Sequence, residues 1–146
     1  ANIIYLDARK LMNHVTESKV NGVATRTLKT SAEVAVVLAH ALYKEQIYTL
    51  NDKITIQTWL IKESEAIIEE LKAKEALKLA QRINRKIDEG VIETPYKLPM
   101  PKALILMAHK TLQDSLTRAT MPKLLTRLMD RRLATHITSR MRRITY

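Results

Sequence analysis

The sequence predicts an all-α protein: a four- to five-helix bundle with a basic N-terminal arm and a long middle helix. Only two glycines and four prolines occur among 146 residues, whereas a β-rich fold of this length needs many tight turns. A stretch from 51 to 89 contains neither Gly nor Pro. Hydrophobic residues make up 46% of the chain, which is enough for one real core.

Residues 1–30 are expected to form an N-terminal helix followed by a basic arm, and residues 31–146 the helical bundle. Residues 1–20 can form a helix but lack a clean apolar stripe. Residues 19–31 contain Gly22, four hydroxyl residues and no acid, which indicates an extended arm or, equally, an ordinary surface linker. The basic residues of this stretch are Lys19, Arg26 and Lys29.

Two helices are expected in the centre of the chain. Thr30 and Glu33 fit a capping box, and the helix that follows, over 31–48, is apolar nearly all round and therefore buried. The next helix runs from 51 to 89 and ends at Gly90, so it would be about 55 Å long if unbroken. Its apolar 3/4 spacing slips between residues 71 and 76, which indicates a bend or a change of partner surface.

Residues 90–101 contain three prolines and read as a linker. A fourth helix is expected over 102–118. Thr120 can cap a fifth, with Pro122 in its first turn, reaching about residue 143.

The net charge of +10 is unevenly distributed along the chain. Residues 1–30 carry a net +3, residues 31–96 a net −2, and residues 97–146 a net +9. A positive field favours polyanions such as nucleic acid. The middle therefore reads as a scaffold and the two ends as the binding surface.

The last predicted helix places four cations on one side. Lys123, Arg127, Arg131 and Arg142 fall within about 100° of arc, opposite an apolar face. Arginine can bind phosphate with two hydrogen bonds at once. The residues expected to contact nucleic acid are Lys19, Arg26, Lys29, Arg118, Lys123, Arg127, Arg131, Arg132, Arg140, Arg142 and Arg143.

Several alternatives remain open for this basic surface. It could meet an acidic protein partner, a membrane surface or only solvent, and the chain could be a small helical protein–protein subunit of a ribonucleoprotein or viral adaptor complex. A helix-turn-helix regulator would need its turn at 118–121, where no glycine lies. Aromatic residues are scattered, which favours duplex over single-stranded nucleic acid, with double-stranded DNA favoured and RNA possible.

No catalytic, metal or cofactor site is predicted, so the chain is not expected to be an enzyme. The four histidines form no HxxxH or HExxH pair, and two glycines cannot build a phosphate-binding loop. The glutamates at 65, 69 and 70 have lysines at helical spacing, which is typical of a solvated, salt-bridged face. No apolar run approaches the roughly 18 residues of a membrane span, and no signal peptide is recognisable.

The basic arm (Lys19 to Lys29), the apolar central helix (Val34 to Ile47) and the arginine-rich final helix (Lys123 to Arg143) together resemble the major nucleocapsid proteins of filamentous and rod-shaped archaeal viruses. The resemblance lies in the architecture of the whole chain, without a diagnostic motif. It implies a small helical bundle that wraps double-stranded DNA and stacks into a filament, by self-association or with a related helical subunit. It also implies location in the virion; a cellular protein of this kind would be cytoplasmic.

Overall fold

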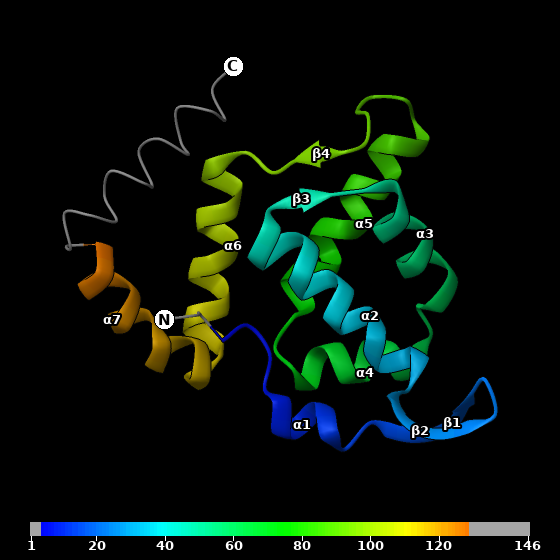
Figure 1. Cartoon of the computed structure of the whole chain (residues 1–146). Coiled ribbons are helices and arrows are strands. Elements are labelled where there is room, and N and C mark those ends of the chain that lie inside the picture. Colours follow the sequence, from blue (N-terminus) through cyan, green and yellow to red (C-terminus); the bar gives the residue numbers. More distant parts are fainter. Residues whose placement is uncertain (1–3, 129–146) are drawn as a thin grey trace.

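The computed structural model describes residues 4–128, except for the side chains of Val20 and residues 123–128. These residues form a helical body from which one β-hairpin extends (Figure 1). In chain order the elements are α1 (Ala8–Met12), β1 (Val15–Val20), β2 (Val23–Leu28), α2 (Thr30–Leu38), the π-helix η1 (Ala39–Glu45), β3 (Ile47–Tyr48), α3 (Leu50–Trp59), α4 (Lys62–Glu70), α5 (Lys74–Asp88), β4 (Tyr96–Lys97), α6 (Met100–Gln113) and α7 (Ser115–Leu128).

The prediction of an all-α, four- to five-helix bundle is wrong. The described residues contain seven α-helices and two antiparallel two-stranded sheets, β1–β2 and β3–β4. The first sheet is a hairpin in place of the predicted arm, and its turn is Asn21-Gly22, with φ of 51° and 82°. Asn-Gly is strongly preferred in such a turn because both residues tolerate positive φ. The overall composition of the chain does not reveal this hairpin, because one Asn-Gly pair is enough to form its turn.

The long middle helix is also corrected, because residues 50–88 form three helices, α3, α4 and α5. The first break precedes Ser64, whose hydroxyl donates to the carbonyl of Trp59 (2.8 Å) and accepts from the N–H of Ile61 (3.2 Å). The second break contains Lys72, with φ of 55°, and lies where the apolar spacing predicted a bend. Both breaks let the three short helices turn their apolar faces towards α2, which contacts all of them.

The central helix is buried as predicted, but its start and end differ from the prediction. Val34, Ala35 and Leu38 are fully buried in α2, and the chain continues as the π-helix η1. The capping box predicted at Thr30 is absent, because the N-cap residue is Lys29. A capping box forms instead at the start of α3, where Thr49 and Asp52 exchange hydrogen bonds.

The C-terminal part of the described chain breaks at a different place from the one predicted. The helix break lies at Asp114, and α7 begins at Ser115 and runs through residues 118–121. Thr120 therefore lies inside α7 and does not cap a helix, and Pro122 lies within the same helix rather than in its first turn. Asp114 provides the cap, since its carboxylate accepts from the N–H of Leu116 (3.0 Å).

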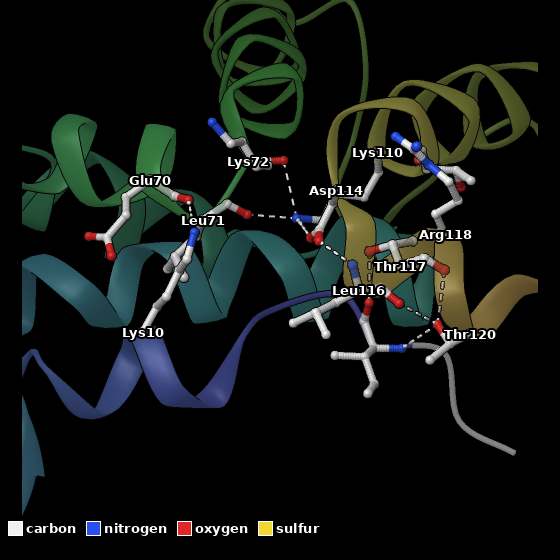
Figure 2. Close-up of polar contacts among 12 residues, drawn as sticks. Lys10, Glu70, Leu71, Lys72, Lys110, Asp114, Leu116, Thr117, Arg118 and Thr120 are labelled. Carbon is white, nitrogen blue, oxygen red and sulfur yellow. Dashed lines mark hydrogen bonds and ion pairs between the residues drawn. The ribbon is translucent and has the colours of Figure 1, made fainter.

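A buried ion pair joins α4, α6 and α7 (Figure 2). Lys110, only 1% exposed, donates to Asp114 Oδ2 at 2.7 Å and to the carbonyls of Leu71 (2.6 Å) and Lys72 (3.2 Å). The ammonium also lies 5.8 Å from the ring centroid of Tyr43. Burial lowers the pKa of Lys110, and the hydrogen bond and charge of Asp114 only partly oppose that shift.

The N-terminal segment packs on the same region. The ring of Tyr5 stacks on Tyr43, with 5.9 Å between centroids. The hydroxyl of Thr117 in α7 donates to the carbonyl of Ile4 at 2.8 Å (Figure 2). These contacts tie the start of the described chain to its last helix.

Candidate nucleic-acid interface

The β1–β2 hairpin extends from the helical body beside α2 and α4 (Figure 1). Its two strands are in register from the Val15–Leu28 pair at the base to the Val20–Val23 pair at the turn. Because side chains alternate along a strand, the hairpin has two distinct faces. A ribbon of two strands is one of the two elements that the major groove of B-DNA admits.

One face of the hairpin is basic near its tip. Lys19 pairs with Ala24 and Arg26 pairs with Glu17, so both cations lie on the same face and both are exposed. Neither cation forms an ion pair or a side-chain hydrogen bond within the described part of the chain, although Glu17 lies directly opposite Arg26. Both are therefore available to an external anion.

The other face carries hydroxyl groups. Thr16 pairs with Thr27 and Ser18 with Thr25, and the hydroxyl of Thr27 donates to that of Ser18 at 3.2 Å. Hydroxyl side chains are common donors to phosphate oxygens. The hairpin thus offers cations on one side and neutral donors on the other.

The base of the hairpin adjoins α1 across an apolar hollow of about 370 Å³. Ala8, Met12 and Leu28 line this hollow, and so does Arg26. Arg9, next to Ala8 in α1, is exposed, and its guanidinium has no acidic partner among residues 4–128. Sequence reasoning missed Arg9, although the neighbouring pair Arg9-Lys10 was a visible basic signal.

Two other predicted site residues have partners in the fold. Lys29 Nζ lies 3.5 Å from Glu63 Oε1 of α4, and both side chains are about half exposed. Arg118 in α7 donates to the carbonyls of Thr111 (3.3 Å) and Leu112 (2.6 Å) at the end of α6. The structure therefore gathers Lys19 and Arg26 on one hairpin, with Lys29 next to its base, whereas Arg118 belongs to α7, across the body from the hairpin (Figure 1).

The remaining predicted site residues belong to the C-terminal end of the chain. Lys123 and Arg127 lie in α7, and their side chains are not described. The others lie outside the described residues: Arg131, Arg132, Arg140, Arg142 and Arg143.

Three of the four histidines, His14, His40 and His109, belong to the described residues and lie in different segments of the fold. His14 Nε2 lies 3.1 Å from a carboxylate oxygen of Glu70, while His40 and His109 are exposed. Residues 4–128 contain no group of three or more His, Asp or Glu side chains that could hold a metal ion. The turn that a helix-turn-helix would need at 118–121 is helical.

None of the helices in the described part of the chain is long and apolar enough to cross a membrane. No protein-family model, no curated protein and no solved structure matches the chain.

Proposed function

We propose that the protein is a structural nucleic-acid-binding protein that coats or packages double-stranded DNA through contacts to the phosphate backbone. The observation that carries this proposal is the projecting β1–β2 hairpin, whose cations Lys19 and Arg26 have no acidic partner in the described chain. The chain from residue 118 onwards, with eight basic residues and one acidic residue, adds a second basic region. Repeated copies would bind along the duplex, as subunits of a filament like the viral nucleocapsids that the chain resembles.

Backbone binding is favoured over reading of the base sequence. The exposed side chains of the hairpin include Thr16, Lys19 and Arg26, which suit phosphate oxygens. Asn and Gln, which recognise adenine, are absent from both strands. We therefore expect similar affinities for unrelated duplex sequences.

The test is a gel shift with random duplex DNA, duplex RNA and single strands at rising salt. The hairpin variant is Lys19→Glu/Arg26→Glu. Its matched control is Lys62→Glu/Lys97→Glu, which makes the same charge change at two exposed lysines without ion pairs in the described structure. Each lost phosphate contact should reduce the salt slope by about 0.9, so the hairpin variant should lose nearly two.

We expect the hairpin variant to bind duplex DNA at least about tenfold more weakly at 100 mM salt, because two phosphate contacts become repulsive. The control should lose only the smaller effect of a reduced net charge. Equal affinities for the two variants would contradict a role of the hairpin. If the wild-type protein binds neither duplex DNA, duplex RNA nor single strands, nucleic-acid binding is refuted.

A further inference from the structure

A groove of about 420 Å³ runs between α5 and α6, far along the chain from the hairpin. Aliphatic side chains from both helices and from the segment after α5 form its walls, and Tyr96 of β4 adds an aromatic ring. These aliphatic residues are Leu79, Ile83, Ile92, Ile105 and Leu106. The volume lies in the range of pockets that bury a ligand, about 300–1,000 Å³.

Both rims of the groove are basic. Lys78, Arg82 and Lys86 follow one another at four-residue intervals on α5, and Lys102 and His109 lie seven residues apart on α6. Residues four apart lie on the same side of a helix. Each rim therefore presents its basic residues over about two turns, a length of about 12 Å.

A single acid, Glu75, lines the groove and leaves most of this charge uncompensated. Glu75 Oε1 pairs with Lys78 Nζ at 2.7 Å. The hydrogen bond from Lys78, with the positive charges of Lys78, His109 and Arg82, holds the pKa of Glu75 below its ordinary value. Arg82, Lys86 and Lys102 form no ion pair with any described residue. Lys102 Nζ donates to the hydroxyl of Tyr96 at 3.5 Å. An anionic occupant would thus find three cations that have no acidic partner among the described residues.

Apolar surface continues beyond the groove along the outside of α6. Ile105 is 60% exposed, Leu104 62% and Leu112 72%. Ile105 and Leu112 are seven residues apart, so they lie on one side of the helix about 10 Å from each other. An elongated occupant that follows α6 would cover Ile105 and Leu112 while it reaches both rims.

We propose that the α5–α6 groove docks an acidic amphipathic helix of a partner protein. Aliphatic side chains of that helix, at i, i+4 and i+7 spacing, would fill the groove and cover Ile105, in the manner of helix-in-groove recognition. Its Glu and Asp residues would flank that apolar stripe and pair with Arg82 and Lys86 on one rim and Lys102 on the other.

Other occupants fit this surface less well. A nucleic acid would place phosphates against an aliphatic floor with only one aromatic ring, Tyr96, for stacking. A second copy carries a net +10, and its most acidic helix, α4, buries its apolar residues Ile67 and Ile68 in its own core. A second copy therefore cannot present both the acidic and the apolar side chains of α4 to the groove.

The test is selection from a display library of 18-residue helical peptides whose flanking positions vary freely among Glu, Lys, Gln and Ser. Wild-type protein should enrich peptides with Leu or Ile at i, i+4 and i+7 and Glu at the flanks. One selected peptide, synthesised and labelled, is then titrated by fluorescence anisotropy against the wild type and three variants.

The variants are Arg82→Glu/Lys86→Glu, Ile105→Gln, and the control Lys62→Glu/Lys97→Glu. We expect at least tenfold weaker binding to the first, at least threefold weaker binding to the second, and less than threefold change for the control. All replaced residues are exposed, and circular dichroism checks that helicity is kept. A scrambled peptide of the same composition should bind at least tenfold more weakly than the selected one.

The proposal is overturned if selection yields no peptide whose binding depends on the groove, or if the scrambled peptide binds equally well. Enrichment of Lys instead of Glu would also overturn it. In parallel, Arg82→Glu/Lys86→Glu should bind duplex DNA as the control variant does. If the variant loses only duplex binding, Arg82 and Lys86 belong to the nucleic-acid-binding surface. If the protein self-associates through the groove, the occupant of the groove is a second copy of the chain.

Discussion

At the scale of single residues, Lys110 links several elements of the helical body. It is one of the few buried charged groups in the described structure, and it contacts the end of α4, the ring of Tyr43 and the cap of α7. Removal of one member of a buried ion pair leaves the other charge without a partner, which is costlier than removal of both.

We therefore expect Lys110→Met to lower the free energy of unfolding by about 3–5 kcal/mol, since Asp114 would remain buried and unpaired. The double variant Lys110→Met/Asp114→Asn should be more stable than this single variant, because Asn keeps the cap of α7 without the charge. Urea unfolding followed by circular dichroism measures both. A loss below about 1 kcal/mol for Lys110→Met would show that the pair contributes little.

The same pair predicts a pH dependence of stability. Burial raises the pKa of Asp114, but hydrogen bonds from Lys110, Leu116 and Thr117 and the charge of Lys110 outweigh it, so the pKa lies below its ordinary value. A carboxyl with a lowered folded-state pKa contributes stability above its unfolded pKa and loses it as the pH falls through the folded value.

The free energy of unfolding should thus decrease from about pH 4 downwards, and part of this decrease should be missing in Asp114→Asn. Urea titrations at several pH values between 2 and 7 compare the two proteins. If both lose stability in parallel over this range, Asp114 is not the titrating group.

At the scale of elements, the β1–β2 hairpin was the feature that sequence reasoning could have found and did not. Asn21-Gly22, between strands of Val and Thr, is a strong local signal for a two-residue turn. The composition of the whole chain indicated few strands, but the Asn-Gly pair was the better guide to the structure of this segment. The break at Asp114 was likewise visible as an Asp-Ser pair suited to an N-cap.

Gly22→Ala should destabilise the hairpin by about 1 kcal/mol, because an L side chain at φ of 82° is strained. No atom lies within 4 Å of the added Cβ, so crowding is not the cause. Amide hydrogen exchange over residues 15–28 should accelerate about fivefold, while the helical body keeps its protection.

Gly90→Ala is the matched control, since Gly90 also has positive φ, at the end of α5. It should leave exchange in the hairpin unchanged and affect the end of α5 instead. If Gly22→Ala opened the whole molecule, the hairpin would be part of the cooperative core rather than an extension from it.

At the scale of the whole molecule, the two proposed sites are built from separate parts of the chain. The hairpin comprises residues 15–28, and the residues that line the groove lie between 75 and 109. If both proposals hold, duplex DNA and the acidic peptide should bind at the same time. The dissociation constant of the labelled peptide should change less than threefold when a short duplex saturates the protein, and full competition would show that the two ligands share one surface.

The sequence by itself determined the helical majority, the buried central helix, the end of α5 at Gly90 and the concentration of positive charge at the two ends. These features depend on composition, or on periodicity and caps that are formed by residues close together in the sequence. It did not determine where the middle segment breaks, because those breaks let α3, α4 and α5 pack on α2.

Only the tertiary structure decided which cations are free. Lys29 forms an ion pair with Glu63, 34 residues away along the chain. Arg118 donates to the carbonyl of Leu112, 6 residues away, and Lys110 to that of Leu71, 39 residues away. Lys19 and Arg26 meet none in the described structure. An ion pair depends on distance in space, and packing of the helices sets that distance, so a list of basic residues cannot by itself say which of them remain available to bind.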